Sequence, residues 1–173
     1  MAGLGELEIS AELVCALVRS QFPRWAELPV VPVEPGGRDN RTFRLGDELS
    51  VRLPSAEGYV PQVDKEHRWL PVLAPALPRE VPQPVARGRP GHGYPWPWSI
   101  YRWLDGVPAR PDRLNDPVGF ARRLADFLTA LHSLDASGGP PPGLHNFYRG
   151  GPVGRYDADT RRAIETLAGD IDG

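Results

Sequence analysis

The sequence has very little cysteine and lysine. Its single cysteine, Cys15, excludes a scaffold of disulfides and a cysteine-rich zinc site. Its single lysine, Lys65, stands against nineteen arginines. Any chemistry that usually needs a lysine must therefore use Lys65 or an arginine.

The sequence also lacks a surplus of charge and a long apolar run. A formal net charge of −2 gives no basic surface for non-specific binding of nucleic acid or of an acidic membrane. No apolar segment approaches the roughly 18–20 residues of a membrane span. Residues 1–8 lack the basic region and apolar core of a signal peptide. We therefore expect a soluble cytoplasmic protein that binds neither nucleic acid nor membrane.

What is present is a globular composition divided into short segments. The 173 residues are 40% hydrophobic and 24% charged, enough for one compact domain or for a small lobe with part of another. The 21 prolines and 19 glycines separate apolar segments and form no low-complexity tract. This pattern predicts many short elements joined by tight turns.

Hydrophobic periodicity and turn residues predict an α+β fold. Strands are predicted over 30–33, 42–45, 49–53, 82–87 and 97–104, with a turn over 88–93. Helices are predicted over 11–19 with Ser10 as the cap, over 61–73, over 117–131 with Asp116 as the cap, and over 158–167. The order favours a five-stranded, mainly antiparallel sheet with one helix on a face, and it disfavours a parallel doubly wound sheet.

Glu66 falls in the middle of an apolar stripe of the helix predicted over 61–73. Helical spacing places it among Val63, Trp69 and Leu70. A carboxylate there is costly unless it is paired, although it could also bend outward at the edge of the stripe. We predict an ion pair with Arg52, at a hydrogen-bonding distance of roughly 2.7–3.2 Å. Arg52 is the candidate because it lies on the strand face opposite Val51 and Leu53.

The segment Gly36-Gly37-Arg38-Asp39-Asn40 joins two predicted strands. Glycines there permit a positive φ and a close approach of the backbone, which suit a phosphate-binding loop. An ordinary hairpin is the alternative. The segment is not a G-x-G-x-x-G motif and lacks the G-K-[ST] ending of a P-loop.

The order of these features is that of the small lobe of a protein-kinase-like fold. The sequence resembles the aminoglycoside phosphotransferase family of small-molecule kinases. The matching stretches are G-G-R-D-N-R-T-F-R-L-G-D (36–47), V-R-L-P (51–54), K-E-H-R-W-L-P (65–71), G-Y-P-W-P-W-S-I-Y-R-W-L-D-G (93–106) and L-H-N-F-Y-R-G-G-P (144–152).

The resemblance implies a small lobe with its hinge over 1–104, and a linker with the start of an incomplete helical large lobe over 105–173. It implies that a loop covers the nucleotide, that Arg52 replaces the usual lysine over the phosphates, and that Glu66 holds Arg52. Tyr101 would line the pocket, and the backbone of 102–104 would meet adenine. The implied nucleotide-binding residues are Gly36, Gly37, Arg38, Asn40, Arg52, Glu66, Tyr101, Arg102, Trp103 and Leu104.

The family's catalytic segments have no counterpart in this sequence. Neither the histidine-glycine-aspartate loop nor the later aspartate-phenylalanine-glycine-like segment occurs, so no catalytic or metal-binding residue is assigned. The four histidines have no metal-ligand spacing and are expected to be structural. Mg²⁺ is expected only if further large-lobe residues complete the site.

The resemblance therefore implies part of an ATP-dependent phosphotransferase acting on a small-molecule hydroxyl, inactive by itself. The alternative is a non-catalytic remnant that binds a nucleotide or a protein. The acceptor cannot be predicted from these residues. An apolar helix face formed by Phe120, Leu124, Leu128 and Leu131 is expected to be exposed or covered by a second copy.

Overall fold

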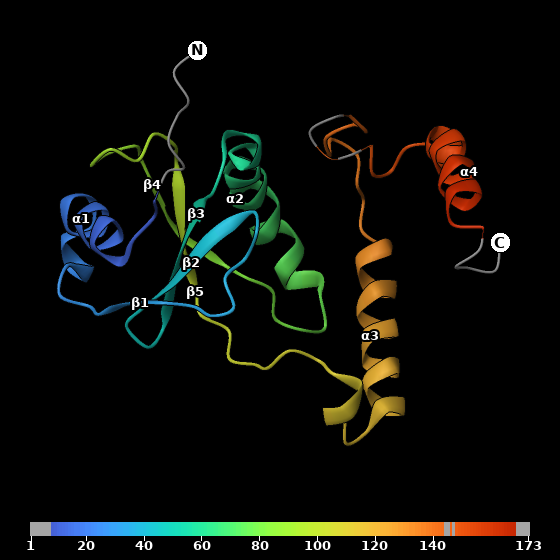
Figure 1. Cartoon of the computed structure of the whole chain (residues 1–173). Coiled ribbons are helices and arrows are strands. Elements are labelled where there is room, and N and C mark those ends of the chain that lie inside the picture. Colours follow the sequence, from blue (N-terminus) through green and yellow to red (C-terminus); the bar gives the residue numbers. More distant parts are fainter. Residues whose placement is uncertain (1–7, 144–145, 147, 169–173) are drawn as a thin grey trace, which may run out of the picture. The chain divides into compact units, whose positions relative to one another are not determined.

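The structure is a computed structural model that describes residues 8–143, 146 and 148–168 (Figure 1). The chain divides into two compact units, Met1–Asp135 and Ala136–Gly173. The first unit holds the sheet and three helices, and the second holds a short helix. The lobe boundary at residue 104 stays a prediction.

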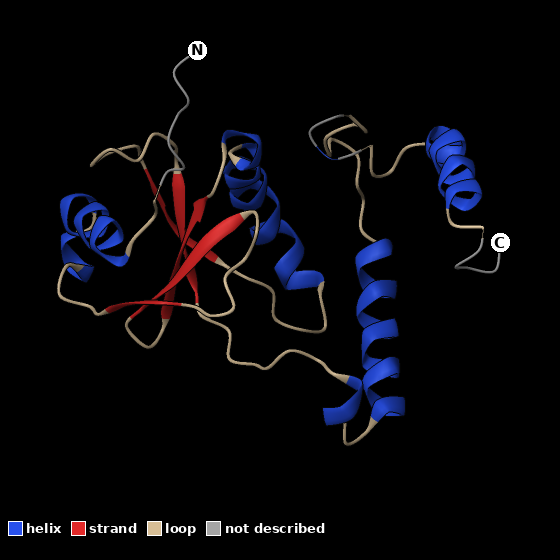
Figure 2. Ribbon diagram, viewed as in Figure 1, coloured by secondary structure: helices blue, strands red, loops and turns tan. Residues whose placement is uncertain are grey.

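The first unit is built on a five-stranded antiparallel sheet with the strand order β1-β2-β3-β5-β4 (Figure 2). Its strands are β1 (Val30–Pro32), β2 (Asn40–Leu45), β3 (Leu49–Pro54), β4 (Pro84–Gly88) and β5 (Trp98–Arg102). The predicted α+β class and the antiparallel sheet are confirmed.

Four α-helices form where the sequence predicts them. They are α1 (Ala11–Gln21), α2 (Pro61–Leu73), α3 (Pro117–His132) and α4 (Asp157–Thr166). Both predicted caps are present, since Ser10 accepts a hydrogen bond from the amide of Leu13 and Asp116 accepts one from that of Gly119. No described helix combines the length and the apolar character needed to cross a membrane.

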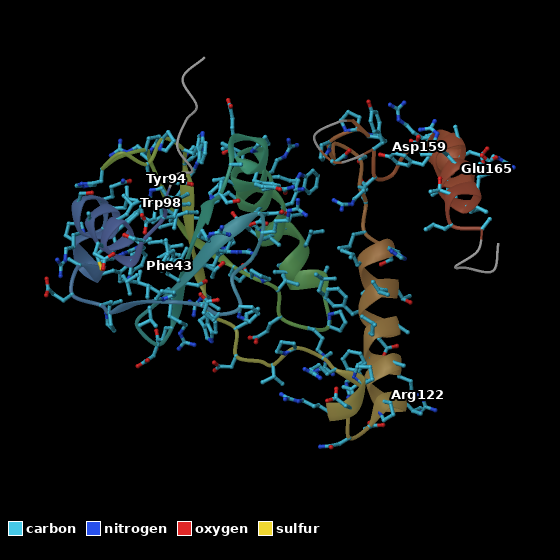
Figure 3. All side chains as sticks on the ribbon, viewed as in Figure 1. Phe43, Tyr94, Trp98, Arg122, Asp159 and Glu165 are labelled. Carbon is cyan, nitrogen blue, oxygen red and sulfur yellow. The ribbon has the colours of Figure 1, made fainter. Side chains whose placement is uncertain are left out.

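The sheet carries a helix on each face, whereas the sequence predicted a helix on one face only. Helices α1 and α2 lie on opposite sides of the strands (Figure 1). The apolar core lies on the α1 side, where Figure 3 shows Phe43, Tyr94 and Trp98. The buried core residues are Val14, Leu17, Val18, Phe43, Leu45, Val51, Leu53, Tyr94, Trp98 and Ile100. Because side chains alternate along a strand, this packing leaves a polar face toward α2.

Gly88 is the last residue of β4 and is not part of the turn predicted over 88–93. It pairs with Trp98 on β5. The buried indole of Trp98 lies across the backbone at this point, and a Cβ built on Gly88 would overlap the ring. The close approach of an aromatic ring therefore explains why glycine ends this strand.

Helix α3 has no fully buried residue. Leu124 and Leu128 are exposed, while Phe120 and Leu131 are partly buried. The expected exposure of this face is thus found at two of its four residues. Self-association through this face stays a prediction.

Helix α4, in the second unit, carries ion pairs along its surface. Arg161 pairs with Asp157 at 2.7 Å and Arg162 with Asp159 at 3.5 Å. These exposed pairs are typical of a solvated helix and stabilise it only slightly.

Candidate functional site

The predicted ion pair between β3 and α2 is present on the polar face of the sheet. Arg52 Nη1 lies 3.6 Å from Glu66 Oε2, and the two side chains are 33% and 27% exposed. The outward-bending alternative for Glu66 is therefore wrong. The predicted hydrogen-bonding distance is also wrong, because 3.6 Å is an ionic separation beyond the usual range.

Tyr101 explains this longer separation. Its hydroxyl donates a hydrogen bond of 2.5 Å to Glu66 Oε2, the same oxygen that faces Arg52. The Arg52 guanidinium carbon also lies 5.3 Å from the centre of the Tyr101 ring. Burial, together with the bond to Glu66, raises the pKa of Tyr101 well above its ordinary value, so the hydroxyl remains a donor at neutral pH.

His67 and Ser99 form a second polar contact between α2 and β5. His67 Nε2 and Ser99 Oγ share a hydrogen bond of 3.0 Å, and Ser99 is almost fully buried. Burial lowers the pKa of His67, the nearby Arg87 lowers it further, and Asp64 opposes the shift. Arg87 itself pairs with Asp64 at 2.6 Å. These contacts fix α2 on the sheet and agree with the structural role expected for His67.

The loop between β1 and β2 is held by its carbonyl groups. Arg41 donates to the carbonyl of Gly37 at 2.7 Å, and the Ser55 hydroxyl donates to that of Arg38 at 2.7 Å. The Ser55 amide donates to the carbonyl of Asp39 at 3.0 Å. The amides of residues 37, 38 and 39 have no hydrogen-bond partner within the described part of the chain. The loop therefore presents backbone donors to solvent.

Of the two reasons that the sequence suggested for these glycines, positive φ and a close backbone approach, only the second is found, and at one position. Neither Gly36 nor Gly37 has a positive φ. A Cβ on Gly37 would lie only 3.0 Å from the carbonyl oxygen of Asn40, whereas one on Gly36 would meet nothing. A close backbone approach thus accounts for glycine at Gly37 alone.

The segment after β5, where the hinge is predicted, has one free amide. The amide of Arg102 donates to the carbonyl of Gln83 at 2.9 Å, and that of Trp103 donates to the carbonyl of Glu48 at 2.8 Å. The amide of Leu104 has no partner in the described regions. Of the three predicted base-contacting residues, only Leu104 therefore offers a free N–H.

The side chain of Trp103 is engaged within the protein. Its indole N–H donates to Asp105 at 2.8 Å, and the guanidinium of Arg44 stacks over the ring at 4.1 Å. Arg44 and Asp105 are themselves 3.9 Å apart. These contacts hold the start of the linker against β2.

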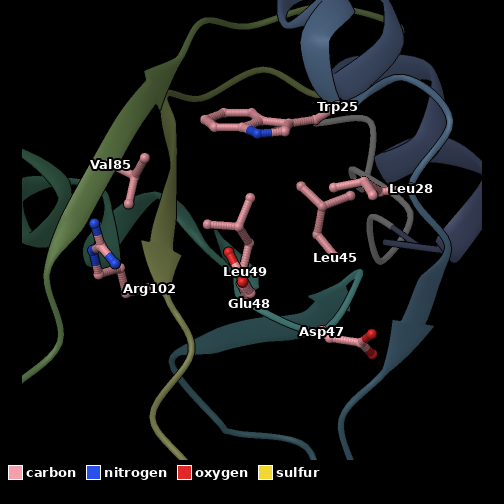
Figure 4. Close-up of a pocket in the computed structure, with 8 residues that line it drawn as sticks. All are labelled: Trp25, Leu28, Leu45, Asp47, Glu48, Leu49, Val85 and Arg102. Carbon is pink, nitrogen blue, oxygen red and sulfur yellow. The ribbon is translucent and has the colours of Figure 1, made fainter.

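A cavity of about 440 Å³ lies beside Arg102, where β5 ends (Figure 4). It is lined by Trp25, Leu28, Leu45, Asp47, Glu48, Leu49, Val85 and Arg102. It includes neither the Arg52–Glu66 pair nor the loop between β1 and β2, and Arg102 is the one predicted site residue in its lining. No group of three histidine, cysteine, aspartate or glutamate side chains suited to a metal ion occurs within residues 8–143, 146 and 148–168.

Comparison with known structures identifies the fold. The GDP complex of a point mutant of aminoglycoside 2′-phosphotransferase-IIIa is similar with a TM-score of 0.73 and 20% identity, over 94% of this chain and 54% of that one. The GDP and kanamycin complex of APH(2″)-IIIa is similar with a TM-score of 0.66 and 21% identity, over 91% of this chain and 52% of that one. ADP-bound APH(2″)-Ib is similar with a TM-score of 0.55 and 18% identity, over 92% of this chain and 51% of that one. The predicted kinase-like fold is confirmed.

The chain spans about half the length of these solved structures. A comparison with curated proteins found no match. A sequence model of the phosphotransferase enzyme family matches residues 30–169, which is most of the chain. The chain therefore belongs to the phosphotransferase enzyme family, as its resemblance to aminoglycoside phosphotransferases implied.

Proposed function

We propose that this chain forms the nucleotide-binding part of an ATP-dependent phosphotransferase. The observation that carries the proposal is the Arg52–Glu66 pair beside a loop with free amides. Asn40 ends that loop and pairs with Pro54, two residues along β3 from Arg52. Free amides and a guanidinium are donors suited to phosphate oxygens.

Four more of the predicted residues take defined places in this proposal. Gly36, Gly37 and Arg38 form the phosphate loop, and the backbone of Leu104 contacts the base. Bound ATP would supply the γ-phosphoryl group. Arg52 would stabilise the charge of the other phosphates with its fork of N–H groups, whose shape differs from the ammonium of a lysine.

The acceptor that we propose is a hydroxyl of a small molecule. Similar structures contain GDP, ADP or kanamycin, and kanamycin is a small amino sugar with hydroxyl groups. An aminoglycoside is therefore one candidate among small hydroxylated amines. We also propose a cytoplasmic location, where ATP is available.

Removing the guanidinium tests the phosphate site. Arg52→Ala is expected to weaken ADP binding by about tenfold to a hundredfold, because a charge-assisted hydrogen bond contributes on the order of 1.5–3 kcal/mol. Adenosine lacks phosphates and should bind both proteins equally. Isothermal titration calorimetry measures both ligands. Arg87→Ala is the control, since Arg87 pairs with Asp64 on the same side of the sheet. Equal losses in the two variants would contradict the proposal.

A second substitution tests the hinge. Leu104→Pro removes the one free amide of the segment and should weaken binding of both adenosine and ADP about tenfold. Leu104→Ala shortens the same side chain but keeps the N–H. Trp103→Ala removes a side chain that is engaged by Asp105 and Arg44. Both alanine variants are expected to bind better than Leu104→Pro, and the reverse order in the titrations would exclude a base-contacting backbone.

The second candidate function is a binding module without catalysis. The free loop amides and Arg52 would suffice for it, because binding a nucleotide needs no catalytic carboxylate. Both candidates predict binding of ADP. They differ in one assay. Only the phosphotransferase predicts that a protein containing this chain releases ADP from ATP when an acceptor is added.

A further inference from the structure

We propose that Tyr101 is a positioning residue for Arg52. Its hydroxyl fixes the Glu66 carboxylate, and the carboxylate in turn orients the guanidinium toward the nucleotide phosphates. This inference rests on the proposed nucleotide-binding function. It assigns to the Tyr101 hydroxyl a role that the residue types and their spacing did not indicate.

The distances show which partner holds Glu66. The Tyr101 hydroxyl lies at 2.5 Å from Glu66 Oε2, a short hydrogen bond, whereas Arg52 lies at 3.6 Å from the same atom. Hydrogen bonds to an ionised carboxylate are among the shortest and strongest in proteins. The position of the carboxylate is therefore set mainly by Tyr101, with Arg52 attracted by charge alone.

Tyr101 itself is rigid. It is 2% exposed and lies inside β5, where it pairs with Ser50 on the adjacent strand β3. A buried aromatic ring in a central strand has little freedom to change its rotamer. Its ring also lies 5.3 Å from the guanidinium carbon of Arg52. Tyr101 thus limits the position of Arg52 directly through its ring and indirectly through Glu66.

In this arrangement Tyr101 holds the Glu66 carboxylate, and the N–H groups of Arg52 are left for the ligand. A guanidinium has five N–H donors, and here none is hydrogen-bonded to Glu66. Arg52 can therefore donate to phosphate oxygens without first breaking a hydrogen bond to the carboxylate. Glu66 stays fixed by Tyr101 while Arg52 is shared with the ligand.

The test compares two buried tyrosines of the full chain. Tyr101→Phe removes the hydroxyl that holds Glu66, and Tyr94→Phe removes one that donates to the carbonyl of Pro54 in the core at 2.9 Å. We expect Tyr101→Phe to weaken ADP binding about tenfold and to leave adenosine binding unchanged. Tyr94→Phe should change neither affinity, although both variants lose one hydrogen bond of a buried tyrosine and should lose similar thermal stability.

Combining Tyr101→Phe with Glu66→Gln separates positioning from a general structural effect. Without the charge on Glu66, the tyrosine hydroxyl has no ion pair to position, so adding Tyr101→Phe should weaken ADP binding less than about twofold. A full tenfold loss in the Glu66→Gln background overturns the inference. So does equal loss of ADP and adenosine binding, or unchanged ADP affinity in Tyr101→Phe. Absence of ADP binding by the unsubstituted chain overturns the proposed function, and the role of Tyr101 with it.

Discussion

Gly88→Ala is expected to destabilise the first unit by about 3 kcal/mol, the upper end of the usual cost of overpacking a core. A Cβ at this position would overlap the Trp98 ring. The ring cannot move away easily, because it is fully buried and its N–H donates to the carbonyl of Arg89 at 3.0 Å. It also packs edge-to-face against Phe22, which follows α1, at 5.6 Å. Relief of the overlap must therefore shift β4, β5 or α1.

Urea unfolding followed by tryptophan fluorescence measures this loss. Gly58→Ala is the matched control, since a Cβ on Gly58 would meet no atom within 4 Å and its φ is not positive. The control should change the free energy of unfolding by less than about 0.5 kcal/mol, the usual range for surface substitutions. A Gly88→Ala protein as stable as the control would show that Trp98 does not lie across β4.

Local patterns in the sequence predict most of the elements. Ser10 and Asp116 precede apolar periods of helical spacing and cap the helices that follow. The alternation around Arg52 assigns it to the strand face opposite Val51, and helical spacing assigns Glu66 to a face of α2. Each of these inferences needs only the period of one element. The pairing of Arg52 with Glu66 is predicted because Glu66 falls in an apolar stripe of its helix and Arg52 lies on the polar face of the neighbouring strand.

Features that depend on two or more elements could not be predicted in this way. The bond from Tyr101 to Glu66 requires the register of β5 against β3 and the placement of α2 over both. Gly88 has the residue type of a turn, and only the position of Trp98 explains it within a strand. The occupied amides of Arg102 and Trp103 depend on carbonyls of Gln83 and Glu48, each at least 19 residues away in the sequence.

The distribution of charge over the sheet also depends on packing between elements. Alternation alone does not say which helix covers the apolar face of a strand. Here α1 takes that face, so the polar face that remains carries Arg52, Ser99 and Tyr101 beneath α2. The candidate site is polar because the core lies on the other side of the sheet.

The purified 173-residue chain is expected to show no acceptor-dependent release of ADP from ATP. Phosphoryl transfer depends on positioning and on charge stabilisation, which require carboxylates that hold Mg²⁺ and one that accepts the hydroxyl proton. Several of the described aspartates are placed for other contacts. Asp105 accepts from the Trp103 indole, Asp116 caps α3, and Asp157 pairs with Arg161. Asp170 and Asp172 lie outside the described residues.

The assay incubates the chain with ATP, Mg²⁺ and a panel of amino-sugar and amino-alcohol acceptors, and follows ADP. A complete phosphotransferase of the same family, run beside it, shows that the conditions support transfer. The chain should still bind ADP in calorimetry, because the loop amides, Arg52 and the Leu104 amide are all present. ADP release that rises with acceptor would mean that an aspartate of this chain accepts the hydroxyl proton. Single aspartate-to-asparagine variants would then identify it by the loss of that release.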